Sequence, residues 1–102
     1  LKENGDLVAL IKPQFEAGRE KVGKHGIIHD PKVHEEVINM IINFAVENQY
    51  DVWDLDFSPI TGGHGNIEFL IHLRAVDREG QIAPEIDPHR VVQQAHATLQ
   101  NQ

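Results

Sequence analysis

The pattern of apolar and polar positions predicts five regular segments, and the first of them is a strand. Residues 6–11 (Asp-Leu-Val-Ala-Leu-Ile) form a short, nearly continuous apolar run that stops at Lys12-Pro13. A run without alternation is typical of a strand buried on both faces, as in a parallel sheet covered by helices. Proline cannot donate a hydrogen bond to a neighbouring strand, so Pro13 should mark the strand's end. The glycine-containing stretch 14–29 is expected to be a loop, long for a compact domain.

Two Asp-Pro pairs mark the expected helix starts. Aspartate is a favourable N-cap and proline suits the first helical position, so Asp30-Pro31 should open a helix from about residue 31 to 48. Its apolar residues recur at helical spacing: Val33, Val37, Ile38, Ile41 and Ala45. Asp87-Pro88 repeats the signature and should open a second amphipathic helix, to about residue 100. Its apolar face would be formed by Val91, Val92, Ala95 and Leu99.

Two further strands are expected between the helices. Residues 50–57 read as a strand ended by Ser58-Pro59, the tract 61–65 as a tight turn, and residues 66–74 as an alternating strand. The first two strands, joined by a helix, should be parallel through a right-handed crossover, whereas the third follows a short connection and should be antiparallel. The pattern therefore predicts an α/β fold, half of a doubly wound sheet with an antiparallel strand near its edge.

Composition narrows the class of protein without indicating a function. The 102 residues are 40% hydrophobic and 25% charged, as in an ordinary globular domain. No apolar run approaches the ~18 residues of a membrane span. The lack of cysteine excludes thiolate chemistry and fits a reducing cytoplasm. The net charge of −7 argues against a nucleic-acid binder, but residues 12–32 hold five basic against three acidic side chains. A polyanion would have to meet this first third of the chain.

Lys12 and Glu68 are the candidate pair that strand topology brings together. Ligands of open α/β sheets bind at the carboxyl ends of the parallel strands, and Lys12 and Ser58 follow two such ends. An antiparallel third strand starts where those strands finish, so Glu68, on the face opposite Ile67 and Phe69, should share their edge. Burial and neighbouring charge would tune the pKa of each group in such a cleft. On spacing alone, a salt bridge that stabilises the sheet edge is the favoured interpretation, and a functional pair stays open.

Three other patterns are weaker. Residues 18–25 nearly match a phosphate-binding loop, but His25 replaces the magnesium-binding hydroxyl and no helix should begin there. The seven histidines include no pair four residues apart on an expected helix with a third ligand nearby, so no metal site is predicted. His34, followed by two glutamates, is expected on an exposed helix face. Ser58 precedes a proline and lacks the nucleophile elbow of hydrolases.

Separate segments of the chain resemble one known family. Residues 9–20 (ALIKPQFEAGRE) strongly resemble the VKPQFE-GRE segment of the hemolysin A (TlyA) family, whose members carry an FtsJ-like methyltransferase domain. The resemblance continues through residues 26–34 (GIIHDPKVH) and resumes at residues 58–62 (SPITG) and 65–70 (GNIEFL). It is specific because the segments occur in the family's order, and it covers roughly residues 5–73.

The resemblance implies transfer of a methyl group from S-adenosylmethionine to a ribose 2′-hydroxyl of ribosomal RNA. FtsJ-like enzymes use a Lys-Asp-Lys-Glu tetrad, in which Lys12 looks like the second lysine and Glu68 like the final glutamate. The first lysine, the aspartate and the glycine-rich cofactor loop have no counterpart in this sequence, so no cofactor-binding residue is assigned. Arg19, Lys21 and Lys24 are candidates for contacts with RNA phosphates, and a solvated loop is the alternative.

Residues 1–102 are accordingly expected to be the C-terminal part of an FtsJ-like methyltransferase domain. The sequence opens without Met, which suggests a piece of a longer parent that would be inactive alone. The expected partner is ribosomal RNA or a ribosomal subunit in the cytoplasm, and no membrane. Two alternatives stay open. One is a non-enzymatic α/β fragment that self-associates through an uncovered sheet edge. The other is the cytolysin that the family name suggests, although no basic amphipathic helix supports it.

Overall fold

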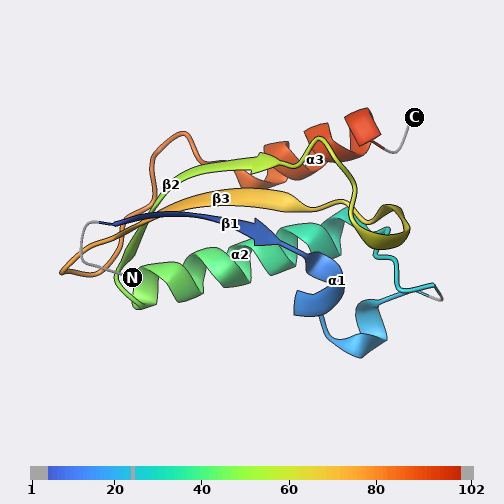
Figure 1. Ribbon diagram of the computed structural model, residues 1–102, viewed down its shortest axis with the longest axis horizontal. Helices are drawn as coiled ribbons and strands as arrows, with labels where there is room; N and C mark the ends of the chain where they lie inside the picture. Colours follow the sequence, from blue (N-terminus) through green and yellow to red (C-terminus); the bar gives the residue numbers. More distant parts are fainter. Residues whose placement is uncertain (1–4, 24, 100–102) are drawn as a thin grey trace.

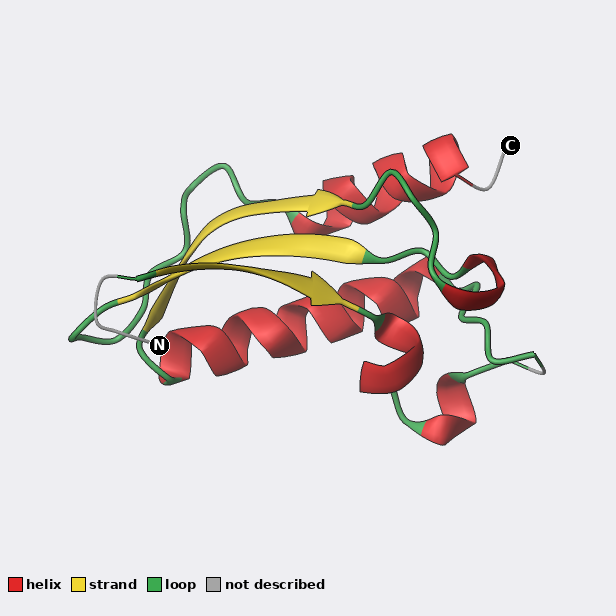
Figure 2. Cartoon of the chain, viewed as in Figure 1, coloured by secondary structure: helices red, strands yellow, loops and turns green. Residues whose placement is uncertain are grey.

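The computed structural model describes residues 5–23 and 25–99. Its strands are β1 (Asp6–Ile11), β2 (Tyr50–Phe57) and β3 (Phe69–Ala75), and its α-helices are α1 (Pro13–Glu16), α2 (Pro31–Glu47) and α3 (Pro88–Leu99). Two short 3₁₀ turns, η1 (Arg19–Lys21) and η2 (Gly63–Gly65), complete the described elements. Figures 1 and 2 show the strands side by side, with α2 and α3 running along them.

β3 lies in the middle of the sheet and pairs antiparallel with both other strands. β1 and β2 therefore run parallel to each other, as expected for strands joined through a helix, although β3 separates them. The antiparallel direction of β3 is confirmed, but among the described strands β3 is central and not near the edge as expected, because it pairs with both β1 and β2. The α/β fold and the order strand, helix, strand, strand, helix are confirmed.

The core lies on one face of this sheet, where α2 and α3 pack against each other and against β2. Successive side chains of a strand point to opposite faces, so alternate strand residues supply the core. The sheet contributes Ile11, Val52, Leu55, Phe69 and Ile71, and the helices contribute Val37, Ile38, Ile42, Val92 and Ala95. Val8 and Leu10 of β1 lie on the other face and are exposed, so the expectation that this strand is buried on both faces was wrong: the described helices cover only one face of the sheet.

The Asp-Pro pairs act as predicted. The Asp30 carboxylate accepts a hydrogen bond from the Lys32 backbone N–H at 2.9 Å, and α2 then runs to Glu47. The helix ends where Gln49 takes a positive φ of 67°, which an α-helix cannot continue. At α3, the Asp87 carboxylate accepts a hydrogen bond from the Arg90 N–H at 3.2 Å.

His34 does not lie on an exposed helix face, and that prediction was wrong. Its side chain is 0% exposed, and its ring meets the Phe69 ring edge-on at 5.6 Å between centroids. The buried stripe of α2 keeps three of the five predicted residues but has His34 and Ile42 in place of Val33 and Ile41, because α2 faces α3 as well as the sheet. The His34 Nδ1 lies 2.7 Å from the His96 Nε2 of α3. Burial, aided by His96, lowers the pKa of His34 to about 4.

Two boundaries also differ from the prediction. The expected loop 14–29 begins with the helical turn α1, because Pro13 at the first helical position presets the backbone angle that a turn needs. Residues 66–68, expected in the third strand, lie outside β3 because their backbone bonds the preceding connection instead. The Asn66 carbonyl accepts from the Gly62 N–H at 2.8 Å, and the Glu68 carbonyl accepts from the Ser58 N–H at 2.9 Å.

Candidate active site

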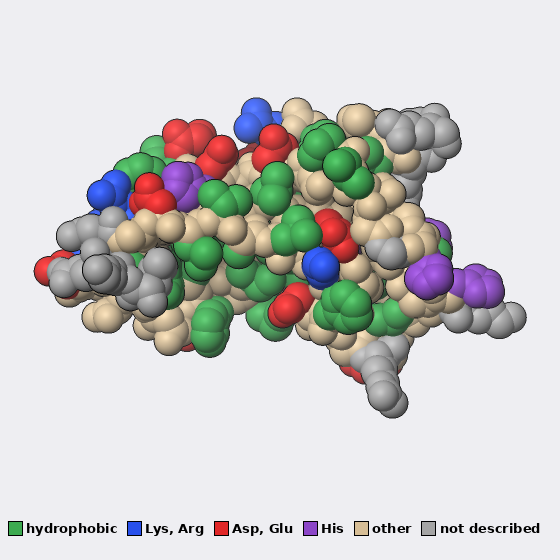
Figure 3. All heavy atoms as spheres, in the orientation of Figure 1, with side chains coloured by type: hydrophobic (Ala, Val, Ile, Leu, Met, Phe, Trp, Pro, Cys, Tyr) green, Lys and Arg blue, Asp and Glu red, His purple; other side chains and the backbone are tan. Residues whose placement is uncertain are grey.

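A cavity of about 490 Å³ opens where β1 leads into α1 and the β2–β3 connection enters β3. Its walls include both predicted site residues together with amide, aromatic and imidazole groups: Lys12, Gln14, Phe15, His25, His64 and Glu68. The β1–β3 ladder accounts for the meeting of Lys12 and Glu68, since Ile11 pairs with Phe69 and the two site residues occupy the next register positions. In Figure 3 a basic side chain lies beside acidic ones in the region where β1 joins α1.

Glu68 is a buried carboxylate that is only partly satisfied by the protein. Glu68 is 5% exposed, and its Oε2 accepts a hydrogen bond from the Gln14 Nε2 at 2.8 Å. Within residues 5–23 and 25–99 there is no ion pair between Glu68 and Lys12, whose side chain is exposed. The salt bridge favoured from spacing is therefore not formed, although both side chains line the cavity.

Gly62 leaves room for the Glu68 carboxylate because it has no side chain. A Cβ added to Gly62 would collide with Oε2 and Cδ of Glu68, so only glycine allows the backbone to approach this closely. The turn after it reverses the chain within a few residues, with His64 at a φ of 60° and Gly65 at 87°. A non-glycine residue with positive φ is uncommon, and here it sets His64 in the wall of the cavity.

Asn66 fastens the opposite wall of the cavity. It is 2% exposed; its Oδ1 accepts from the Ile28 N–H at 3.0 Å, and its Nδ2 donates to the Gly26 carbonyl at 2.8 Å. These bonds fix the loop between η1 and α2 against the entry to β3. Sequence reasoning missed Gln14, Gly62 and Asn66; the signal that could have found them is their place inside the segments that resemble the family.

The three basic candidates do not share this cavity as far as the structure describes them. Lys21 lies in η1, and its ammonium is 2.7 Å from the Glu36 carboxylate of α2. That hydrogen bond, with the charge of Glu36, raises the pKa of Lys21. The backbone of Arg19 lies in the same turn, but its side chain is not described, and Lys24 falls outside the described residues.

The weaker sequence candidates have structural roles or none. The Ser58 hydroxyl donates to the Ile60 carbonyl at 2.9 Å in a local turn. Among the described residues, no cluster of three His, Asp or Glu side chains could hold a metal ion. In the same part of the chain, no helix is long and apolar enough to cross a membrane.

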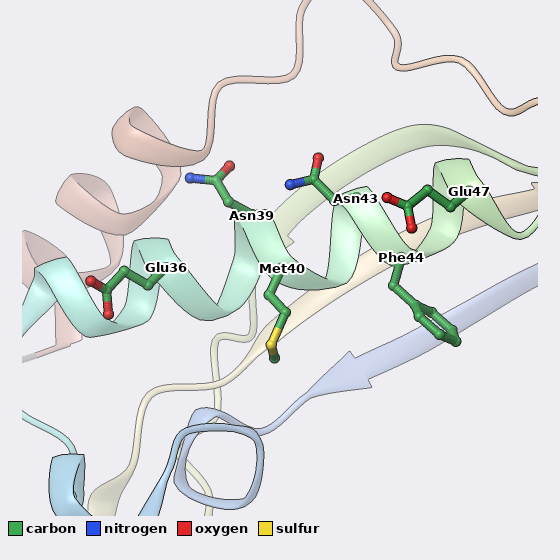
Figure 4. Close-up of a pocket in the computed structure, with 6 residues that line it drawn as sticks. All are labelled: Glu36, Asn39, Met40, Asn43, Phe44 and Glu47. Atoms are coloured by element: carbon green, nitrogen blue, oxygen red, sulfur yellow. The ribbon is translucent and has the colours of Figure 1, made fainter.

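A larger hollow, about 620 Å³, runs along the outer side of α2 (Figure 4). Met40 and Phe44 point from the helix towards the side of β1, while Asn39 and Asn43 point the other way. It has acidic groups at both ends, Glu36 and Glu47, and no basic side chain of the described part of the chain lines it. We do not assign it a role in catalysis, because it offers no acid–base pair.

A second buried carboxylate, Asp51, lies at the opposite end of the sheet. Both of its oxygens accept hydrogen bonds from the Arg78 guanidinium, at 2.8 and 2.9 Å, and one also accepts from the Gln81 N–H at 2.8 Å. These bonds, chiefly those from Arg78, lower the pKa of Asp51. The same segment covers the outer edge of β2, since the Val52 N–H donates to the Gln81 carbonyl at 2.8 Å.

Comparison with known proteins agrees with this geometry. Residues 2–75 match the family described as FtsJ-like methyltransferase. A candidate rRNA methyltransferase of Bacillus subtilis, YqxC, is 54% identical over 101 residues, which cover 97% of this chain and 36% of YqxC. The 16S/23S rRNA (cytidine-2′-O)-methyltransferase TlyA of Mycobacterium tuberculosis is 35% identical over 71 residues, 70% of this chain and 26% of TlyA.

A solved structure supports the same relationship. A candidate hemolysin from Streptococcus thermophilus superposes with a TM-score of 0.92 at 48% identity, over 99% of this chain and 36% of that chain. The present chain thus spans about a third of the length of YqxC and of this structure.

Proposed function

Because the chain belongs to the FtsJ-like methyltransferase family, we propose that residues 1–102 are the C-terminal, substrate-side part of an rRNA ribose 2′-O-methyltransferase. The observation that carries this proposal is that Lys12, which follows β1, and Glu68, which precedes β3, flank the Ile11–Phe69 pair and line one cavity. The similarity to TlyA, whose name states 2′-O-methylation of ribosomal RNA, supports the choice of substrate. The catalytic roles belong to Lys12 and Glu68, the second lysine and the final glutamate of the tetrad.

Lys12 acts on the ribose hydroxyl. This hydroxyl is far too weak an acid to ionise unaided near pH 7, so it needs a group that accepts its proton or stabilises the developing oxyanion. A charged Lys12 orients the hydroxyl and stabilises that oxyanion; a neutral Lys12 accepts its proton. Glu68, which lines the same cavity, supports the orienting role for Lys12.

Glu68 is proposed to position the Lys12 ammonium and the ribose hydroxyl. One of its oxygens is held by Gln14, and the other has no hydrogen-bond donor among residues 5–23 and 25–99. That second oxygen is free to accept a hydrogen bond from the Lys12 ammonium or from the ribose. Holding the hydroxyl in line with the methyl donor supplies a large part of the acceleration in group transfer.

The described residues do not fit a binding site for S-adenosylmethionine, which would supply the methyl group. Dinucleotide- and nucleoside-binding loops in such folds need glycines between a strand and a helix N-terminus. Here β1 and β2 lead into Pro13 and Pro59 instead. The cofactor is therefore assigned to the parent protein, and this chain alone should be inactive.

The partner proposed for the parent protein is ribosomal RNA, or a ribosomal subunit, in the cytoplasm. Arg19, Lys21 and Lys24 are proposed to contact its phosphates. Lys21 can do so only by exchanging its bond to Glu36 for one to phosphate, which the exposure of both side chains permits. Phosphate contacts of this kind weaken as salt rises.

Substitution of Lys12 tests the proposal. Lys12→Ala should abolish rRNA methylation by the parent protein and leave S-adenosylmethionine binding nearly intact, since Lys12 serves the hydroxyl and not the cofactor. Tritiated methyl transfer to ribosomal subunits measures the first, and calorimetry measures the second. Lys32→Ala, at another exposed lysine, is the matched control. Retained methylation in Lys12→Ala would remove the role proposed for it.

A second candidate function is self-association through the edge of β1. No strand covers this edge within the described residues, and Val8 of β1 is 63% exposed. Open apolar edges pair with other strands. If self-association is the function, Val8→Lys should shift sedimentation from dimer to monomer. Cytolysis, suggested by hemolysin names among the relatives, predicts lysis of erythrocytes by the parent protein.

A further inference from the structure

Phe15 is an exposed aromatic side chain in the wall of the candidate active site. It is 75% exposed, and it lines the same cavity as Lys12 and Glu68. The short helix α1 puts it there: the Phe15 backbone N–H donates to the Lys12 carbonyl at 2.9 Å, so the two residues sit on one turn. A phenyl ring held beside a polar cavity offers an apolar face to whatever enters.

Two other exposed aromatic residues are differently placed. Trp53 is covered by its own neighbours, since the Arg74 guanidinium lies 4.9 Å from its ring centre and the His72 ring lies 5.7 Å away. Phe44 projects from α2 and lines the hollow along that helix (Figure 4), not the cavity that Lys12 lines. Of these three, Phe15 alone combines exposure with a place in the cavity of the candidate catalytic pair.

We propose that Phe15 stacks on the base of the nucleotide whose ribose hydroxyl is presented to Lys12. This inference rests on the proposed function and adds a binding contact for the base of the target nucleotide. Within one nucleotide, base and 2′-hydroxyl are attached to neighbouring ribose carbons, so a ring three residues from Lys12 on the same turn can reach the base. Stacking holds a splayed-out base of single-stranded RNA, because each base has a π-face.

Two histidine side chains line the cavity together with Phe15. His25 and His64 lie in its walls and add polar ring edges, and its volume of about 490 Å³ is of the order of one nucleotide. Among the described residues, Glu68 is the one carboxylate in its lining. Stacking on a phenyl ring tolerates any base, so this contact would position the target nucleotide and leave the choice of sequence to other contacts.

The test compares Phe15 variants of the parent protein under single-turnover methyl transfer to ribosomal subunits. Phe15→Ala and Phe15→Leu should lower kcat/KM by about 10- to 100-fold, the size of one base–aromatic stack, whereas Phe15→Trp should restore it. Phe44→Ala, which removes another exposed phenyl ring from α2, should change kcat/KM less than about twofold. Thermal midpoints of all four should match the wild type, because neither ring is in the core.

A substrate whose target nucleotide lacks its base separates stacking from other effects. The wild type should lose about the same factor on this substrate, and Phe15→Ala should lose no more. Equal losses for Phe15→Ala on both substrates, or full activity of Phe15→Ala on the normal one, would overturn the inference. Its failure is distinct from failure of the proposed function, which shows as retained methylation in Lys12→Ala.

Discussion

The two ends of the sheet each carry a buried carboxylate, and the two are satisfied in opposite ways. Asp51, 8% exposed, accepts three hydrogen bonds and is paired with Arg78. Glu68, 5% exposed, accepts one side-chain hydrogen bond, from the neutral amide of Gln14, and borders a cavity. A buried charge without a full set of partners costs stability, so the arrangement at Glu68 is not explained by folding.

The difference separates a structural carboxylate from a candidate functional one. Asp51 ties the segment after β3 to the start of β2, and removing it should loosen that connection. Glu68 keeps an unused acceptor next to Lys12, which is what an incoming hydroxyl would need. Burial is nearly equal at the two sites, so burial alone does not distinguish them; the set of hydrogen-bond donors does.

The largest effect that tests this comparison is on activity. Glu68→Gln keeps the shape and the bond to Gln14 but removes the charge, so rRNA methylation by the parent protein should fall by about 10²- to 10⁴-fold. Asp51→Asn should leave methylation within about threefold, because Asp51 is at the other end of the sheet. Methyl transfer is measured side by side for the two variants. Comparable losses of activity would contradict the distinction between a functional Glu68 and a structural Asp51.

Gly62→Ala tests whether the exact place of the Glu68 carboxylate matters. The added Cβ collides with this carboxylate and must displace it, so methylation should fall by up to about 100-fold. Gly65→Ala is the matched control: its Cβ meets open space but its φ is 87°, so it should cost stability and little activity. If the two variants methylate at the same rate, the close approach of Gly62 to Glu68 does not contribute to activity.

Asp51→Asn should act on stability instead. Loss of its charge-assisted hydrogen bonds should lower the free energy of unfolding by about 1–2 kcal/mol, at the low end because half-exposed Arg78 remains solvated. Glu68→Gln should change it by less than about 0.5 kcal/mol, since its single neutral donor can be kept. Urea denaturation of the two variants measures the difference, and the reverse order would contradict it.

The last effect is on the pH dependence of stability, to which His34 adds a third buried group. Burial holds the pKa of His34 at about 4, below its unfolded value, so the unfolded chain binds the proton first. Stability is therefore complete above about pH 6.5 and falls by about 1 kcal/mol per pH unit towards pH 4. The groups facing His34 that contribute are His96, Asp30 and His29.

Two variants separate the contributions of His34 and Asp51 to the loss of stability at low pH. His34→Gln should flatten the stability curve between pH 6.5 and 4. Because the pKa of Asp51 is lowered, its contribution is present above its unfolded pKa near 3.8 and is lost below it, so Asp51→Asn should flatten only that part. Urea midpoints measured across pH separate them, and an unchanged curve for His34→Gln would contradict the buried neutral imidazole.

Much of the fold follows from local signals that the sequence carries by itself. The Asp-Pro caps predicted where α2 and α3 begin, and unbroken or alternating apolar runs predicted all three strands, with β3 starting three residues later than expected. Strand order also predicted that Lys12 and Glu68 share a sheet edge. These features depend on neighbours along the chain, or on the simple rule that a helical crossover gives parallel strands.

Only the tertiary structure decided which buried groups are satisfied. Gln14 reaches Glu68 across 54 positions, and Asn66 reaches Ile28 across 38, so no local pattern indicates either bond. His34 is buried because α3 covers a face of α2 that the helix alone would leave to solvent. Periodicity and caps act within a few residues, whereas hydrogen-bond partners and burial depend on how the whole chain packs. The sequence thus determined the elements and the meeting of Lys12 with Glu68, and the packing decided that Glu68, unlike Asp51, keeps an acceptor to spare.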